Sequence, residues 1–298
     1  MIKVFKSNQK KQQVIESYNH LLELWNVNYQ EVDLKTQFGT THCIISGNKA
    51  NPPLLMFHGV GDNSAVMWIL NIQELSEHFY CISVDTLGGP GKSIPNENFN
   101  KKKFNQVKWI NDLVRQLEIC NINILGISNG AYMAYNYLTY ESNTIDKVVC
   151  LEGGMVIGNP YKNMIRTLLI MFPHILLPNR SNMIAILKKL SSPESNFINN
   201  CPNVVNHMIM VMKSHNQKAM FAHGLEKYEK EKGILVRDKL LFLIGDYKVD
   251  NKRKFINVLE DGGYNYKIIK GAGHGINHEQ PKIVNSEIIQ FLLKDSGI

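Results

Sequence analysis

The sequence lacks a long hydrophobic run and a secretory signal, and each absence excludes a class of protein. Its longest apolar stretch, LLIMFPHILLP at 168–178, is interrupted by Pro173 and His174 and is shorter than the ~20 apolar residues that span a bilayer. The N-terminal segment, MIKVFKSNQKKQQ, has no apolar core of the kind that a secretory signal needs. We therefore expect a cytoplasmic protein without a membrane span.

Paired cysteines are also lacking. The five cysteines include no C-x-x-C pair, and their odd number leaves one without a partner. Cys43, Cys81 and Cys150 lie inside apolar runs, where cysteine usually acts as a small buried hydrophobe. This distribution fits a reducing compartment and argues against a disulfide framework. Because neither the Cys nor the His residues show metal-ligand spacing, the sequence implies no metal and no cofactor.

Acidic residues are in modest deficit, with 26 Asp and Glu against 33 Lys and Arg, which gives a net charge of +7. An excess of this size can indicate binding to nucleic acid. The basic residues are scattered along the chain, however, and the densest run, Lys101-Lys102-Lys103, opens an amphipathic segment. A solvated helix start explains that run, so we expect no nucleic-acid partner.

The stretch VDTLGGPGKSIP at 84–95 ends in Gly91-Lys92-Ser93, as a phosphate-binding loop ends. That loop needs a glycine five residues before Gly91, so that successive backbone N–H groups can turn towards the phosphates. Thr86 stands at this position, and Pro90 removes one N–H donor. The pattern therefore argues against a nucleotide site.

Short apolar runs alternate with segments of helical periodicity, which is typical of an α/β protein with a doubly wound, mostly parallel sheet. The expected strands are 41–47, 54–59, 80–85, 122–128, 147–153, 239–245 and 266–271. The expected helices lie near 66–78, 103–119, 129–141, 251–260 and 281–294. Residues 41–59 are expected to form an antiparallel hairpin at the sheet edge.

The alternation stops between about 155 and 235, where the sequence is helical and rich in Met, Ile and Leu. We interpret 155–235 as a helical cap inserted over the carboxyl edge of the sheet, where α/β sheets bind ligands. The remaining residues, 1–154 and 236–298, would form the core, with an N-terminal helix at about 9–26.

The motif G-x-S-x-G occurs once after an apolar run and before a helical segment, as Gly126-Ile127-Ser128-Asn129-Gly130. Small flanking residues allow a sharp turn that lifts the serine hydroxyl above the sheet edge. A serine nucleophile needs a base, and His274 lies in a glycine-rich loop after the last expected strand. We therefore predict Ser128 as nucleophile and His274 as general base.

Two backbone donors are needed to hold the oxyanion that forms during acyl transfer. One is expected from Asn129, the residue after the nucleophile, and the other from Val60 in the loop HGVGD. Gly59 would let the backbone approach the developing charge. His58 is expected to support this loop, and His278 to be structural.

These residues together resemble the α/β-hydrolase superfamily, and within it the bacterial carboxylesterase-like proteins. The resemblance rests on three motifs and runs from about Trp25 to Leu293, weakest through the cap. They are an oxyanion loop (His58-Gly59, Met67-Trp68, Asn71), a second loop (Asp85, Gly88, Ser93-Ile94-Pro95) and a closing segment (Ala272-Gly273-His274, Glu279-Gln280-Pro281). The resemblance implies a Ser-His-acid triad in an α/β-hydrolase fold with a helical cap.

The triad acid departs from the family pattern. The resemblance implies an Asp or Glu three residues after Gly245, but that position is Lys248. Asp246 is on the same side of an extended chain, so we favour it as the acid. Asp250, and Glu152 at the end of another expected strand, remain alternatives.

The sequence thus predicts a serine carboxylesterase that cleaves small or medium acyl esters through an acyl-enzyme. Amide or C–C bond hydrolysis and acyl transfer on the same scaffold are alternatives, because a fold alone does not fix the reaction. A non-catalytic ligand-binding protein is another, favoured by Lys248. The expected partner is a small-molecule ester, and the sequence does not indicate the oligomeric state.

Overall fold

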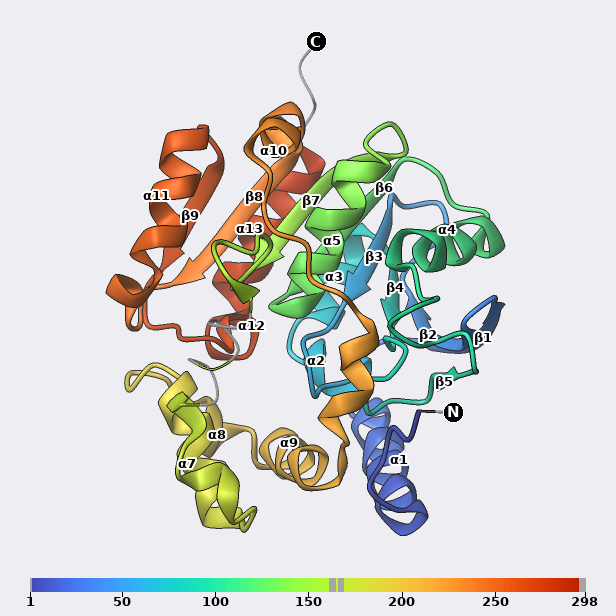
Figure 1. Cartoon of the computed structure of the whole chain (residues 1–298), viewed down its shortest axis with the longest axis vertical. Helices are drawn as coiled ribbons and strands as arrows, with labels where there is room; N and C mark the ends of the chain where they lie inside the picture. Colours follow the sequence, from blue (N-terminus) through green and yellow to red (C-terminus); the bar gives the residue numbers. More distant parts are fainter. Residues whose placement is uncertain (1, 161–164, 166–168, 295–298) are drawn as a thin grey trace.

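The computed structural model describes residues 2–160, 165 and 169–294, and a mostly parallel nine-stranded sheet forms the centre of this part of the chain (Figure 1). The strand order is β1-β2-β4-β3-β6-β7-β8-β9, and β5 pairs with β2. From β4 to β9 all neighbours are parallel, whereas β2 runs antiparallel to β1, β4 and β5. The strands are β1 (Tyr29–Thr36), β2 (Gly39–Ser46), β3 (Pro53–Phe57), β4 (Tyr80–Val84), β5 (Ile94–Pro95), β6 (Ile122–Ile127), β7 (Ile145–Leu151), β8 (Leu240–Gly245) and β9 (Asn265–Ile269).

The doubly wound arrangement is confirmed, but the expected hairpin at 41–59 is wrong. β2 pairs with β1, and β3 lies between β4 and β6 in the interior of the sheet. The sequence signal for β1 was weak because YQEVDLKT contains few apolar residues, and its side chains are exposed or half-buried. A strand at the edge of a sheet needs no apolar run. The antiparallel pair at this edge is formed by β1 and β2, which lie within residues 29–46.

Alternate residues of the central strands serve two separate cores. On β3, Leu54 and Met56 contact one cluster, while Leu55 and Phe57 contact the other. The first cluster is covered by α2 (Ser64–Met67), α3 (Ile72–His78) and α13 (Pro281–Leu293), and the second by α4 (Gln106–Leu117), α5 (Asn129–Tyr140) and α11 (Arg253–Gly262). The sheet is therefore buried on both faces, which explains the continuous apolar runs of its inner strands.

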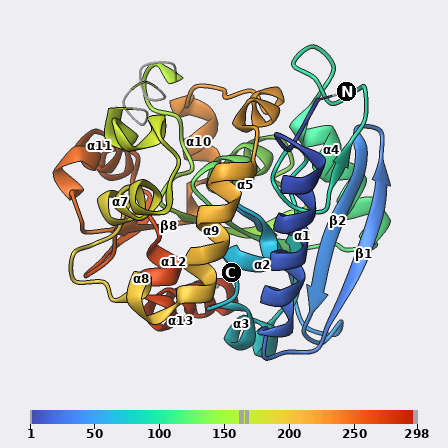
Figure 2. The same ribbon diagram turned by 90° about the horizontal axis from the view of Figure 1, so that it is seen from below.

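The segment between β7 and β8 is helical in its described part: in Figure 1, α7 (Arg180–Leu190), α8 (Phe197–Asn200) and α9 (Pro202–Ser214) lie below the sheet, whereas α10 (Lys230–Val236) lies near the top. Residues 161–164 and 166–168 of the expected cap, and 295–298 of the expected core, lie outside the described residues. Seen from below, α9 lies beside α1 (Asn8–Glu23), the helix expected at about 9–26 (Figure 2). The other elements of this segment are η1 (His174–Leu176) and η2 (Gln217–Ala222).

None of the helices in the described ranges is long and apolar enough to cross a membrane.

Candidate active site

Ser128 lies at a sharp turn between β6 and α5. Its backbone has φ 55° and ψ −114°, a conformation that non-glycine residues rarely adopt. A Cβ on Gly126 would overlap the main chain of Gly130, and one on Gly130 would overlap the main chain of Phe57. Two glycines are therefore needed for α5 to start this close to the sheet, and the turn holds Ser128 half-buried at the strand end.

His274 lies in the loop between β9 and α12 (Ile276–Glu279). Its backbone N–H donates to the carbonyl of Leu190 at the end of α7, at 2.7 Å. Its side chain is 44% exposed, and Nδ1 lies 3.3 Å from Oε2 of Glu152. The imidazole is thus accessible and has a carboxylate at one ring nitrogen, as a general base requires.

Glu152 directly follows β7, and its carboxylate is buried, with 4% of the side chain exposed. Its Oε1 accepts hydrogen bonds from the Gly245 N–H at 2.6 Å and from Lys252 Nζ at 2.7 Å. Burial by itself would raise the pKa of the Glu152 carboxyl, but the interactions with His274 and Lys252 outweigh burial and hold this pKa below its usual value. The carboxylate is therefore ionised at neutral pH.

Asp246, the acid favoured from the sequence, makes no hydrogen bond or ion pair with His274 among the described residues. Its Oδ1 accepts a hydrogen bond from the Ala272 N–H at 3.3 Å, and Asp250 is exposed in η4 (Val249–Lys252). The physical reason is the strand order: β7 lies between β6 and β8, so a side chain at the end of β7 is one strand nearer to Ser128. The carboxylate at the imidazole is that of Glu152, one of the two alternatives that the sequence left open.

Lys248 occupies the position where the family pattern places an acid, and it makes a contact with α7. Its backbone is left-handed, with φ 55°, and its Nζ donates to the carbonyl of Lys189 on α7 at 3.1 Å. The loop after β8 therefore carries two lysines with different contacts. Lys248 contacts α7, whereas Lys252 contacts Glu152.

The loop that carries Val60 lies beside Ser128. A Cβ built on Gly59 would be 3.5 Å from the Ser128 Cβ, so the two main chains approach closely. His58 supports this loop as expected: the Thr86 N–H donates to its Nε2 at 3.0 Å, and its Nδ1 lies 2.8 Å from the Gly59 carbonyl. Val60 follows Gly59 in this loop, and Asn129 follows Ser128 at the start of α5.

The loop at 84–95 is packed around a buried carboxylate. Oδ1 of Asp85 accepts from the Ser64 N–H at 2.9 Å, and Oδ2 accepts from the Lys92 N–H at 2.7 Å. Asp85 is fully buried, and a Cβ on Gly91 would overlap its side chain. The backbone N–H of Lys92 therefore faces a carboxylate, which leaves it no role in holding phosphate.

Glu279 is a site residue to which sequence reasoning gave no role beyond the motif. Its Oε1 accepts from the backbone N–H groups of Gly273 and Gly275, at 3.1 and 3.2 Å, on either side of His274. Its Oε2 accepts from the Ser192 N–H, just after α7, at 2.7 Å. Burial raises the pKa of the Glu279 carboxyl, and the three backbone donors oppose the rise. Glu279 therefore fixes the histidine loop against the segment after α7.

His278 is structural, as expected. Its ring is buried, its Nε2 lies 3.0 Å from the Val66 carbonyl, and it stacks on Phe197.

Comparisons with known proteins identify the same fold. Residues 52–179 match the model of the alpha/beta hydrolase fold family. The chain is 26% identical over 302 residues to an uncharacterized carboxylesterase, nap, of Bacillus subtilis, covering 95% of this chain and 93% of the relative. It is 30% identical over 137 residues to carboxylesterase YbfK of the same organism, covering 46% of each chain.

Solved structures agree. The carboxylesterase CesB (YbfK) from Bacillus subtilis superposes with a TM-score of 0.78 at 21% identity, covering 97% of this chain and 100% of the other. The naproxen esterase from Bacillus subtilis gives a TM-score of 0.78 at 22% identity, covering 97% and 99%. This chain therefore has the α/β-hydrolase fold, and it is similar over nearly its whole length to bacterial carboxylesterases.

Proposed function

We propose that this protein is a serine carboxylesterase that cleaves small or medium acyl esters through Ser128, His274 and Glu152. The observation that carries the proposal is the contact of a buried, ionised carboxylate with Nδ1 of an accessible histidine. This contact fixes the imidazole tautomer in which Nε2 is free to accept a proton. The strained turn that presents Ser128 is the second support.

In the proposed reaction, Nε2 of His274 takes the Ser128 hydroxyl proton while Oγ attacks the acyl carbonyl. The N–H groups of Val60 and Asn129 hold the resulting oxyanion. His274 then gives the proton to the leaving alcohol, and water hydrolyses the acyl-enzyme by the same steps in reverse order. Glu152 does not take the proton: its charge stabilises the imidazolium that forms.

We further propose that residues 155–235 form a cap that contributes to the acyl pocket. The contacts of Leu190 with His274 and of Ser192 with Glu279 support this, because they join the end of α7 to the histidine loop. A cytoplasmic location remains our proposal and is supported by the free, buried thiols of Cys43, Cys81 and Cys150.

The proposal is tested by fluorophosphonate labelling and p-nitrophenyl ester turnover of the wild type beside Ser128→Ala. We expect labelling and turnover in the wild type and neither in the variant. As a matched control, Ser142→Ala removes a hydroxyl remote from the site and should retain both. A wild type that folds but neither labels nor hydrolyses any ester would contradict the proposal and favour a ligand-binding protein. Turnover of esters with different acyl chain lengths then measures which chains the acyl pocket accepts. Uniformly slow turnover would favour cleavage of another bond, such as an amide or C–C bond.

A further inference from the structure

Positive charge is concentrated in the segment between β7 and β8. Residues 153–225 contain seven Lys or Arg and one acid, Glu194, so their net charge is +6. The rest of the chain has 26 basic and 25 acidic residues and a net charge of +1. The basic residues are scattered through residues 153–225, and the net charge is positive because only one acidic residue is present there. Lys162 and Arg166 lie outside the described residues.

Lys6, just before α1, and Lys10, on α1, add cations to the same side of the molecule. Nζ of Lys6 and Nζ of Lys10 donate to the Lys213 carbonyl at the end of α9, at 3.0 and 3.3 Å. Partial burial, and then the charge of Lys10, lower the pKa of the Lys6 ammonium.

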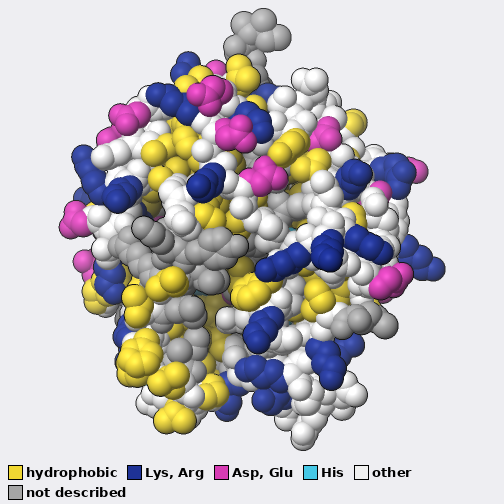
Figure 3. Space-filling view, in the orientation of Figure 1, with side chains coloured by type: hydrophobic (Ala, Val, Ile, Leu, Met, Phe, Trp, Pro, Cys, Tyr) yellow, Lys and Arg dark blue, Asp and Glu magenta, His cyan; other side chains and the backbone are white. Residues whose placement is uncertain are grey.

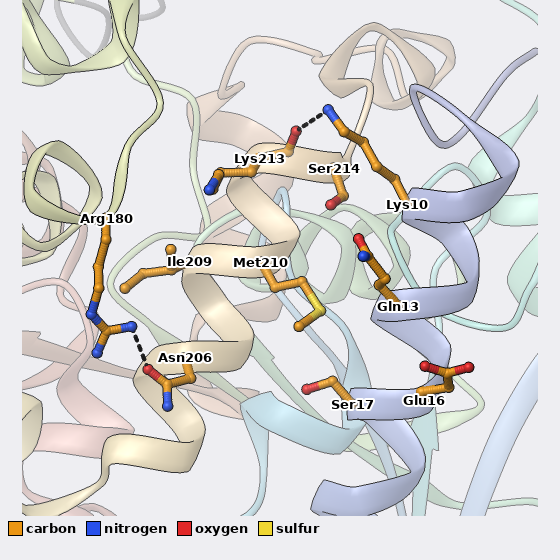
Figure 4. Close-up of a pocket in the computed structure, with 10 residues that line it drawn as sticks. All are labelled: Lys10, Gln13, Glu16, Ser17, Arg180, Asn206, Ile209, Met210, Lys213 and Ser214. Carbon is orange, nitrogen blue, oxygen red and sulfur yellow. Dashed lines mark hydrogen bonds between the residues drawn. The ribbon is translucent and has the colours of Figure 1, made fainter.

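A groove of about 660 Å³ runs between α1 and α9 (Figure 4). Lys10, Arg180 and Lys213 line it together with the apolar Ile209 and Met210. Glu16 is the one acid among the described residues that line this groove. The groove is therefore cationic at its rim and partly apolar.

A row of exposed apolar side chains adjoins this groove through α7. We call it the apolar edge: it consists of Leu169, Ile170, Phe172, Leu176 and Leu177, each between 39% and 68% exposed. The edge is held to α7, since Asn182 Nδ2 donates to the Leu177 carbonyl at 2.8 Å and Lys189 Nζ to the Phe172 carbonyl at 2.9 Å. In Figure 3 apolar side chains gather at the lower left, over this region.

The apolar edge, α7, α9 and α1 lie side by side, as the contacts of η1 with α7, α7 with α9, and α9 with α1 indicate (Figure 2). One face thus combines cations with large exposed apolar groups. Leu176 and Leu177, at 65% and 68%, are among the most exposed large apolar residues of the described chain. Contiguous exposed apolar surface of this kind marks an interaction site.

We propose that this face binds the surface of a bilayer that contains anionic phospholipids. Lysine and arginine near such a surface are attracted by its negative potential, and exposed leucines can enter the boundary between headgroups and acyl chains. A nucleic acid would satisfy the cations but would leave the apolar edge in water. The combination of charge and apolar side chains therefore favours a membrane.

Binding of this kind has a consequence for the substrate. His274 contacts the end of α7 and Ser128 directly follows β6, so a bound enzyme would have its site near esters dissolved in the bilayer. The binding itself does not rest on the proposed function, because it uses none of the three triad residues. Ser128→Ala should bind vesicles as the wild type does, which separates failure of this proposal from failure of the hydrolase assignment.

The electrostatic part is tested by co-sedimentation with vesicles of phosphatidylcholine alone and of an equal mixture with phosphatidylglycerol. The variant Lys10→Gln/Arg180→Gln/Lys213→Gln should bind the mixed vesicles about a hundredfold more weakly, because each cation contributes a factor of about five. The control Lys108→Gln/Arg253→Gln/Lys254→Gln removes the same charge from α4 and α11 and should lose less than about fivefold. Circular dichroism and Tm verify that both variants fold.

The apolar part is tested by Leu176→Ser/Leu177→Ser, with the exposed Leu235→Ser as control. The double variant should bind mixed vesicles at least about tenfold more weakly, since the leucines no longer leave water. No binding of the wild type to mixed vesicles, or equal losses in the two charge variants, would overturn the proposal. So would full binding by the leucine variant together with competition by duplex DNA, which would make nucleic acid the partner instead.

Discussion

Replacing Glu152 by Gln should remove nearly all activity, whereas replacing Asp246 by Asn should remove little. A Gln side chain can still accept from Gly245 and Lys252 through its oxygen. Its NH₂ group would then face Nδ1 of His274, so that nitrogen could no longer donate. The proton moves to Nε2, the atom that must accept from Ser128, and the imidazolium loses its counter-charge.

The magnitude follows from the contact that is lost. An acid that fixes the tautomer contributes roughly 10⁴ in kcat, which corresponds to about 5.4 kcal/mol of transition-state stabilisation. Asn at position 246 can still accept from the Ala272 N–H and changes no atom that touches the imidazole. We expect Asp246→Asn to cost less than about tenfold, because a more distant charge gives weaker stabilisation.

The assay is kcat for a p-nitrophenyl ester, with circular dichroism as a measure of folding and Asp250→Asn as a third carboxylate control. Glu152→Gln leaves the Lys252 ammonium without a carboxylate counter-charge and therefore destabilises the fold. The double variant Glu152→Gln/Lys252→Met removes that charge and keeps the test valid if the single variant unfolds. A loss of about a thousandfold or more in Asp246→Asn, with near-wild-type rates in Glu152→Gln, would refute our assignment of the acid.

Three further predictions follow from the groups around the site. Lys252→Met removes the cation that partly offsets Glu152, so the imidazolium form of His274 gains stability and the acid limb of the kcat/KM profile should move to higher pH. An unchanged profile would contradict this role. In Glu279→Gln only one side-chain oxygen, in place of two, can accept from the backbone N–H groups of Ser192, Gly273 and Gly275. It should lower kcat by about ten- to a hundredfold, as loss of a supporting interaction does, while the exposed control Glu260→Gln retains full activity. Four buried histidines have pKa values lowered to about 4 by burial, from 6.5 in the unfolded chain. Below pH 6.5 the unfolded chain binds more protons than the folded one. The free energy of unfolding should therefore decrease as the pH is lowered from 6.5 to 4, by up to about 1.4 kcal/mol per pH unit for each histidine. The histidines are His207, His215, His223 and His278. Urea unfolding across this pH range measures the change in stability, and a midpoint that does not depend on pH would contradict the prediction.

Glu152 contributes in the same direction, but at lower pH. Its folded-state pKa is depressed, so the stability it adds is present above the unfolded value and is lost as pH falls through the folded value. Acid unfolding should therefore begin with the histidines and be completed by the carboxylate.

Local rules in the sequence were enough for the parallel strands and for the serine turn. Strands β3, β6 and β7 are mostly apolar because both of their faces are covered, and such a run can be recognised from the local sequence. The turn at Ser128 follows from Gly126 and Gly130, whose missing side chains allow the approach of α5 to the sheet. The sequence did not predict the edge strand β1, because a solvated strand carries no apolar run.

The neighbour of His274 was decided by tertiary structure alone. Asp246 and Glu152 both follow apolar strands, and no local pattern says which carboxylate reaches the imidazole. The choice depends on the order of β6, β7 and β8 in the sheet, and on Lys252, which holds Glu152 from 100 residues away in sequence. Likewise, the sequence alone supplied the cations of residues 153–225, but only packing joined them to Lys10 and the apolar edge on one face. Contacts between distant segments depend on the whole fold, because they form only after each strand has taken its place in the sheet.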